Sequence, residues 1–301
     1  MGGCCCVDSN TRSIESKMKL MEVNQSRIRK ILMLGSGASG KTTLFKQLEW
    51  LYGIDHNNPY NDNNNKFNNE DVISRLKTIR ENIRDHIILL MKKSVELYDM
   101  DHIKYQECNV DLNKYKNIVK SIQFLSKYQG IEFTSNYDPK WKQLGIEIKT
   151  IWELKAIQET YKYRNLYSFS DNMDYFYAKA KEIFRDDYSV NKQDFLRSRV
   201  RTTGVNKVKL EINPKNQNQT RIFEIIDVGG QRNERNKWIH QFDNVVSVLF
   251  VAALDHYATV LFEDETENAM QESLELFEQI VTLKHFVKTE MILFLNKKDL
   301  F

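Results

Sequence analysis

The chain has 301 residues, of which 41% are hydrophobic and 28% are charged, so it fits a globular protein with room for two domains and excludes a disordered or fibrous one. Its formal net charge is only +3, from 44 Lys and Arg against 41 Asp and Glu, which gives no indication of nucleic-acid binding. The longest apolar stretch, residues 245–254, is about half of the ~18 residues that a membrane-spanning helix needs, and we expect a buried strand there.

The N-terminus begins MGGCCCVD and lacks the basic and apolar regions of a secretory signal. Gly2 fits N-myristoylation, although Cys6 stands where Ser or Thr is usual, and Cys4, with Cys5 and Cys6 as alternatives, is placed for palmitoylation. Two acyl chains anchor a protein stably. We therefore expect lipid anchoring to the inner membrane leaflet, at the cytoplasmic face of the plasma membrane; the alternative is an end with incidental cysteines.

Residues 11–30 combine basic side chains with apolar ones at near-helical spacing, so residues 1–27 are predicted to form a lipidated amphipathic segment. Such a helix lies on an anionic bilayer, docks on a partner protein or is simply solvated.

A strand is predicted at 28–34, followed by a glycine-rich turn and a helix at 43–52.

An all-helical block is predicted next. Residues 57–69 contain eight Asn and one Pro, which indicates a linker or loop. Apolar residues then recur at helical spacing from 72 to 90, and helix-like segments follow at 112–128, 141–164 and 173–184.

Strand patterns return in the last third of the chain, at 207–212, 221–227, 245–252 and 291–295, with a crossover helix predicted at 266–284. We therefore predict an α/β fold: a doubly wound, mostly parallel sheet interrupted by a large helical insert.

The glycine-rich turn between the first strand and the first helix is a complete G-x-x-x-x-G-K-[ST] phosphate-binding loop. Its residues are Gly35, Ser36, Gly37, Ala38, Ser39, Gly40, Lys41 and Thr42, and Thr43 follows. Backbone N–H groups of such a loop surround phosphate oxygens, Lys41 neutralises their charge and the Thr42 hydroxyl is placed to ligate Mg²⁺.

Two further motifs follow strands. Asn296, Lys297, Lys298 and Asp299 come directly after the strand at 291–295. A carboxylate at Asp299 accepts hydrogen bonds from the N1–H and amino groups of guanine, which adenine does not present together, so the pattern favours GTP over ATP and disfavours an ATP-using kinase.

The second of these motifs contains Asp227, Val228, Gly229, Gly230 and Gln231. Asp227 is placed to hold Mg²⁺ through water, a glycine amide to meet the γ-phosphate and Gln231 to orient the attacking water, whereas a plain Gly-Gly turn is the alternative.

The order of these motifs and the helical insert resemble the heterotrimeric G-protein α-subunit family over almost the whole chain. The resemblance implies a Ras-like P-loop GTPase domain at 28–56 and 197–301 with a helical domain at 57–196 inserted. It also implies an arginine finger at Arg199, a second Mg²⁺ hydroxyl at Thr202, and switches at 227–238 and 263–266. Switch I would comprise Leu196, Arg197, Ser198, Arg199, Val200, Arg201 and Thr202.

The function implied by the resemblance is a Mg²⁺-dependent, slowly GTP-hydrolysing switch. Its GDP form would bind a βγ dimer, a heptahelical receptor would drive exchange, and effector proteins would receive the signal. The slow hydrolysis of such proteins is a known property of the family.

The chain departs from the family pattern at Ala38, where Glu is usual and pairs with the arginine finger in one nucleotide state, and at Ala269, where Arg is usual. Family members also continue beyond the position of Phe301, so we expect the apolar strand at 291–295 to expose an edge and a face. The rival hypothesis is therefore a family-like binding module that holds nucleotide weakly and is not an enzyme.

Overall fold

The computed structural model describes residues 28–53, 69–111, 116–134, 137–212 and 221–301. The predicted lipidation sites (Gly2 and Cys4 to Cys6), most of the basic segment 11–30 and nearly all of the Asn-rich segment 57–69 lie outside these ranges. None of the described helices is long and apolar enough to cross a membrane.

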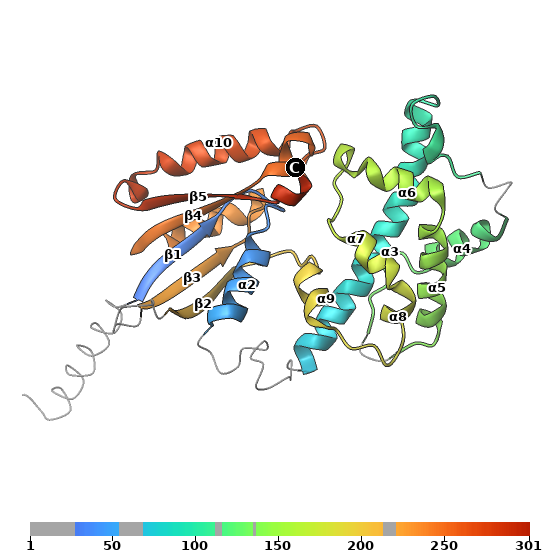
Figure 1. Cartoon of the computed structure of the whole chain (residues 1–301), viewed down its shortest axis with the longest axis horizontal. Helices are drawn as coiled ribbons and strands as arrows, with labels where there is room; N and C mark the ends of the chain where they lie inside the picture. Colours follow the sequence, from blue (N-terminus) through green and yellow to red (C-terminus); the bar gives the residue numbers. More distant parts are fainter. Residues whose placement is uncertain (1–27, 54–68, 112–115, 135–136, 213–220) are drawn as a thin grey trace, which may run out of the picture. The chain divides into compact units, whose positions relative to one another are not determined.

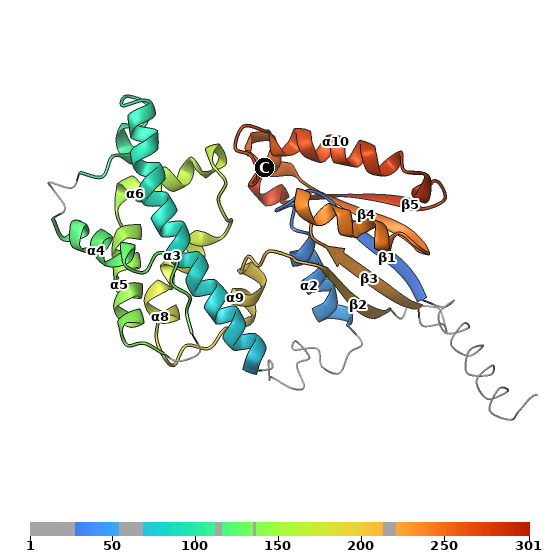
Figure 2. The same ribbon diagram turned by 180° about the vertical axis from the view of Figure 1, so that it is seen from behind.

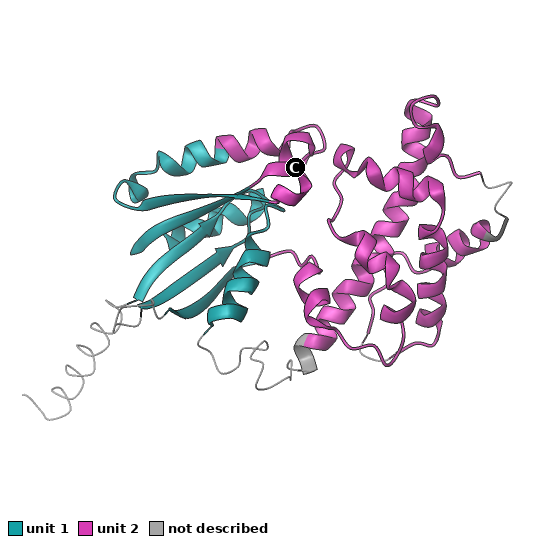
Figure 3. Cartoon of the chain, viewed as in Figure 1, with its two compact units in different colours: residues 1–58, 203–252, 276–296 teal, residues 59–202, 253–275, 297–301 magenta. Residues whose placement is uncertain are grey.

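The chain forms two compact units, and each is described by itself (Figure 3). The sheet unit comprises residues 1–58, 203–252 and 276–296; the helical unit comprises residues 59–202, 253–275 and 297–301. This division assigns 253–275 and 297–301 to the helical unit, in contrast to the domain boundaries inferred from the sequence, which stay a prediction.

The sheet unit is built on a five-stranded sheet in the order β2-β3-β1-β4-β5 (Figure 1). The strands are β1 (Ile28–Leu34), β2 (Val205–Ile212), β3 (Arg221–Val228), β4 (Val245–Ala253) and β5 (Glu290–Asn296). β1 pairs in parallel with β3 and β4, whereas β2 runs antiparallel to β3. The predicted mostly parallel sheet is confirmed.

Helices cover both faces of this sheet, as the two views in Figures 1 and 2 show. On one face, Phe45 of α2 (Lys41–Tyr52) packs in a cluster with Met33 and Ile225. On the other, Leu276 and Ile280 of α10 (Ala269–Val281) pack with Leu32, Val248 and other buried side chains. Burial on both faces explains why β4 shows no alternation of apolar and polar residues.

Among the strands that the structure describes, β5 lies at the end of the order and neighbours β4. Four of its apolar side chains are between 39% and 56% exposed, namely those of Ile292, Leu293, Phe294 and Leu295. The expected exposure of this strand is confirmed.

The helical unit is organised around α3 (Asn69–Met100), whose predicted apolar stripe is buried at Ile79, Ile83, Ile87 and Leu90. Its other helices are α4 (Lys116–Ser126), α5 (Lys140–Trp152), α6 (Lys155–Lys162), α7 (Met173–Ala178), α8 (Ala180–Ile183) and α9 (Lys192–Arg197). Short 3₁₀ turns add η1 (Gln106–Cys108), η2 (Arg164–Leu166), η4 (Leu254–Ala258) and η6 (Lys298–Leu300), and the sheet unit holds η3 (Arg232–Gln241) and η5 (Lys284–Phe286).

Three predicted helices were wrong in extent. The segment 141–164 is two helices, because Leu154 is extended (φ −70°, ψ 128°) and buried. The segment 173–184 breaks at Lys179, whose φ of −100° and ψ of 6° are not helical. The helix predicted from 266 begins at Ala269, because the side chain of Asn268 accepts hydrogen bonds from the N–H groups of Met270 and Gln271 and caps it.

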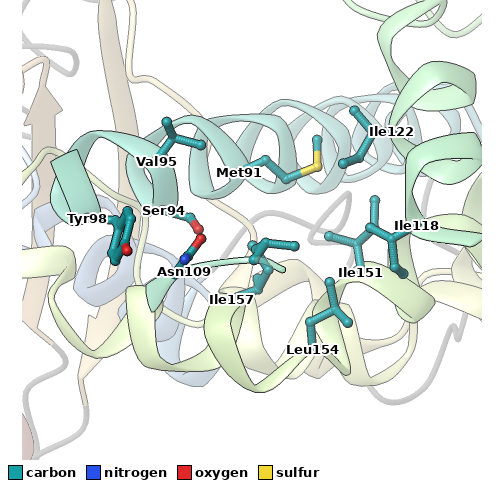
Figure 4. A pocket seen from close by; sticks show the side chains of 11 residues that line it. Met91, Ser94, Val95, Tyr98, Asn109, Ile118, Ile122, Ile151, Leu154 and Ile157 are labelled. Atoms are coloured by element: carbon teal, nitrogen blue, oxygen red, sulfur yellow. The ribbon is translucent and has the colours of Figure 1, made fainter. Parts of the chain in front are cut away.

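A cavity of about 120 Å³ lies between α3, α4, α5 and α6 of the helical unit (Figure 4). Apolar side chains such as Met91, Ile122 and Leu154 line most of it, and Ser94 and Asn109 lie near one another on its wall. Ser94 Oγ already donates to the carbonyl of Cys108, at 2.5 Å. The volume is below the ~300 Å³ of ordinary ligand pockets, so we interpret it as a packing cavity.

Candidate functional site

The phosphate-binding loop joins the buried end of β1 to the first turn of α2. Its backbone takes left-handed conformations at Ala38 (φ 58°) and Gly40 (φ 92°), and Gly35 has a φ of 143° that favours glycine. Lys41 is 5% exposed, and its Nζ donates to the carbonyls of Gly35 (2.9 Å) and Ser36 (2.7 Å). A buried cation is therefore held inside the predicted phosphate-binding loop.

Two glycines let other segments approach this loop closely. A Cβ atom on Gly230 would lie 2.6 Å from the Gly35 carbonyl oxygen and 2.7 Å from that of Ser36, and closer still to Lys41 Nζ. A Cβ atom on Gly40 would collide with the side-chain amide of Asn296. The segment after β3 and the end of β5 therefore both touch the loop, as the meeting of strand ends at one sheet edge predicts.

Asp227 and Thr42 are brought together by this edge. The Thr42 hydroxyl donates to Asp227 Oδ2 at 2.9 Å, whereas Asp227 Oδ1 is buried and has no hydrogen-bond partner in the part of the chain that the structure describes. Burial raises the pKa of Asp227, and the charge of Lys41 and the hydrogen bond from Thr42 oppose that rise.

This pair fits a magnesium ion. Mg²⁺ is commonly held by one or two protein oxygens, with waters and phosphate oxygens completing the octahedron. A hydroxyl beside a buried carboxylate with one unused oxygen supplies such ligands, and no denser cluster of His, Cys, Asp and Glu exists in the described ranges. The third predicted ligand, Thr202, belongs to the helical unit.

Two more buried polar atoms lie in the predicted nucleotide-binding segments, Ser36 Oγ and Gln231 Oε1, and neither has a hydrogen-bond partner among the described residues. Gln231 is 8% exposed and precedes η3, whose Trp238 donates from its indole nitrogen to the Gly229 carbonyl at 2.8 Å. Leaving a buried polar atom unpaired costs about 1–3 kcal/mol, so these atoms mark a region built for a polar ligand.

The motif at 296–299 is divided between the units. Asn296 Nδ2 donates to the Ser39 carbonyl at 2.9 Å within the sheet unit. In the helical unit, Lys297 Nζ forms ion pairs with Asp171 (2.7 Å) and Asp255 (3.3 Å), and Lys297 adopts a left-handed φ of 57°. Lys298 and Asp299 lie in η6 and are exposed.

The predicted switch I segment starts at the end of α9. Asn191 and Asp194 form a reciprocal capping box at its N-terminus, and Asp194 also accepts hydrogen bonds from Lys179, Tyr175 and Tyr188. The chain then becomes extended at Ser198. The α9 helix contains Leu196 and Arg197, and the residues that follow it are Ser198, Arg199, Val200, Arg201 and Thr202.

Arg199 is held by three residues of the helical unit. Its backbone carbonyl accepts from Asn82 Nδ2 at 2.8 Å, its Nη1 donates to Ser170 Oγ at 3.3 Å, and its guanidinium carbon lies 4.8 Å from the ring centre of Phe262. Burial lowers the pKa of Arg199.

Most of the predicted site residues belong to the sheet unit. These are Gly35, Ser36, Gly37, Ala38, Ser39, Gly40, Lys41, Thr42, Thr43, Asp227, Val228, Gly229, Gly230, Gln231 and Asn296. The remainder belong to the helical unit. Sequence reasoning missed the partners Asn82, Asp171 and Phe262, because they come from segments without any motif.

Comparison with known proteins gives consistent results. A family model described as G-protein alpha subunit matches residues 8–301. The chain is 36% identical over 294 residues to the guanine nucleotide-binding protein alpha-1 subunit of Pisum sativum, covering 98% of this chain and 72% of the relative. It is 34% identical over 296 residues to the alpha-1 subunit of Arabidopsis thaliana, with the same coverage, and 33% identical to that of Oryza sativa subsp. indica, covering 97% and 72%.

Proposed function

Because the chain belongs to the G-protein alpha-subunit family, we propose that it binds GTP and GDP with Mg²⁺ and hydrolyses GTP slowly as a molecular switch. The observation that carries the proposal is the set of buried polar groups around the phosphate-binding loop. Lys41, the Thr42–Asp227 pair and the unpartnered oxygens of Ser36 and Gln231 are otherwise costly to bury.

Phosphate binding is the task of the loop and Lys41. Lys41 Nζ donates to carbonyl oxygens of the loop itself, and an arriving phosphate offers it charged oxygens in exchange. A phosphate oxygen adds the attraction between opposite charges to the hydrogen bond that a neutral carbonyl already accepts from the ammonium. The N-terminus of α2 adds the partial positive charge of its dipole at the same place.

Magnesium would be held by the Thr42 hydroxyl and, through water, by Asp227, with Thr202 as the proposed third protein contact. When bound, the ion neutralises charge on the terminal phosphates. Lys41 and Thr42 both favour the carboxylate form of Asp227, so they oppose the rise in its pKa that burial causes.

Guanine selection is assigned to Asp299, whose carboxylate accepts two hydrogen bonds from guanine. Asn296 has a different role, since its amide fixes the end of β5 to the Ser39 carbonyl of the loop. This hydrogen bond links the first residue of the 296–299 motif to the phosphate-binding loop.

Hydrolysis is assigned to Gln231 and Arg199. Gln231 orients the attacking water through its side-chain amide, and Arg199 meets negative charge that grows on the transferred phosphoryl oxygens. Loss of the terminal phosphate then removes contacts that order the switch segments.

As partners we propose a βγ dimer, a heptahelical receptor and effector proteins, with acylation of Gly2 and Cys4 holding the protein at the inner leaflet of the plasma membrane. These proposals rest on family membership and on the N-terminal sequence.

The test is equilibrium binding of fluorescent GDP and a non-hydrolysable GTP analogue to the purified chain with Mg²⁺, using ATP as competitor. We expect binding that ATP does not displace. Asp299→Asn is the matched control: it replaces an acceptor by a donor, so it should weaken guanine binding and favour xanthine, which carries a second carbonyl. Absence of binding by a folded preparation would refute the switch and leave the rival binding module.

A further inference from the structure

Arg199 lies against a small group of side chains that we call the arginine cradle, defined as Asn82, Ser170 and Phe262. All three belong to the helical unit, as does Arg199. Asn82 fixes the backbone carbonyl of Arg199, whereas Ser170 and Phe262 contact its guanidinium. The backbone and the charged end of Arg199 are therefore held independently.

The cradle is supported from behind by α3. His86 lies one turn after Asn82 and its Nδ1 is 2.8 Å from the Asn82 carbonyl oxygen, so Nδ1 carries the proton and donates. The His86 ring meets Phe169 edge to face at 4.8 Å, and Phe169 precedes Ser170. Burial lowers the pKa of His86, the hydrogen bond to the Asn82 carbonyl opposes this, and the nearby charge of Arg199 lowers it further.

The contacts of the cradle hold the guanidinium of Arg199 weakly, so that it can leave them at little cost in free energy. An aromatic face attracts a guanidinium by roughly 0.5–1 kcal/mol at exposed sites, and Phe262 is 51% exposed. The hydrogen bond to Ser170 Oγ is long, at 3.3 Å. Asp171 and Glu263 favour the cation through longer-range attraction. Each contact is weak, in contrast to a bidentate pair with a carboxylate.

Ala38 of the phosphate-binding loop carries only a methyl group, which cannot form an ion pair with an arginine. We propose that in this chain Phe262 and Ser170 form the resting site of Arg199, which its guanidinium leaves in order to meet the transferred phosphoryl group. This inference rests on the proposed function for the catalytic role of Arg199, and it makes Phe262 and Ser170 positioning residues.

The first test is single-turnover GTP hydrolysis by variants at Phe262, a half-exposed residue whose side chain can be changed without opening a core. Phe262→Leu keeps an apolar side chain and removes the aromatic face, so hydrolysis should become about two- to fivefold faster, which is the rate equivalent of the attraction between ring and guanidinium. Phe262→Tyr keeps the face and should stay close to the wild-type rate. A slower or unchanged rate in Phe262→Leu would overturn the proposal.

The second test does not depend on hydrolysis. In protein labelled with ¹⁵N-arginine, the Nη–H signals of Arg199, identified by their loss in Arg199→Lys, should exchange with solvent more slowly than those of exposed arginines. Phe262→Leu and Ser170→Ala should each speed that exchange, and Phe262→Tyr should not. Identical exchange in all variants would refute the cradle even if the protein hydrolyses GTP, whereas changed exchange without any GTP binding would refute only the proposed function.

Discussion

Replacing Gly230 by Ala tests how tightly the segment after β3 packs against the phosphate-binding loop. The added Cβ would sit 2.6 Å and 2.7 Å from two backbone carbonyl oxygens, which cannot rotate away as a side chain can. It would also displace Lys41 Nζ from the same two carbonyls. Overpacking costs about 1–3 kcal/mol and a hydrogen bond to a charged group about 1.5–3 kcal/mol, so with partial relaxation we expect a loss of about 2–4 kcal/mol.

Hydrogen exchange measured by mass spectrometry on peptides from β1 and β3 reports this loss locally. Protection should fall about 30- to 1000-fold, because each 1.4 kcal/mol is a factor of ten. Gly204→Ala is the matched control: Gly204 has a φ of 81° but no atom within 4 Å of the new Cβ, so it carries only the strain of a left-handed backbone, about 1 kcal/mol or fivefold. Equal losses in both variants, or no loss in Gly230→Ala, would refute the argument from close packing.

Three further predictions concern the helical unit, and urea unfolding measures each. Val110→Ile fills part of the cavity with one methylene and should stabilise the unit by about 0.5–1 kcal/mol, at ~24 cal/mol per Å³; destabilisation would show that the cavity cannot accept it. The buried guanidinium of Arg80 donates to the carbonyls of Ile183 (3.0 Å) and Arg185 (2.7 Å), and burial lowers its pKa to about 10. Arg80→Met should therefore lower the free energy of unfolding by about 2–4 kcal/mol, and a loss below 1 kcal/mol would contradict this. Burial raises the pKa of Asp194, but its hydrogen bonds lower it by more, so the folded-state pKa lies below the unfolded-state value of about 3.9. The carboxylate therefore stabilises the fold above that unfolded-state value, and this stabilisation is lost as pH falls through the folded-state pKa. Asp194→Asn should be less stable at pH 7, and its free energy of unfolding should fall less on acidification.

The sequence was sufficient for the parts of the fold that depend on local pattern. The loop from Gly35 to Thr42, the strand before it and the strand ending at Asp227 were predicted because glycine conformations and apolar runs are properties of short segments. Their meeting at one edge follows from parallel pairing of β1 with β3. This much could be predicted from the order of residues alone.

The errors came from contacts between distant segments. Apolar spacing continues across Lys179, yet the helix breaks there and Lys179 Nζ reaches Asp194 fifteen residues on. The cradle of Arg199 escaped prediction for the same reason: Asn82 lies 117 residues away and has the appearance of an ordinary helix-surface amide. Side-chain partners of this kind are decided by packing, which periodicity does not report.

The exposed edge at β5 has a practical consequence for every measurement proposed above. Among the described residues β5 is an outer strand bearing Leu293, Phe294 and Leu295, and such a strand is a template for pairing with a second extended chain. The rate of pairing between two such edges grows with the square of the protein concentration, whereas the rate of GTP hydrolysis per molecule does not depend on it. Light scattering over a dilution series therefore sets the concentration below which kinetics describe single molecules, and a charged residue at position 293 or 295 should raise that limit.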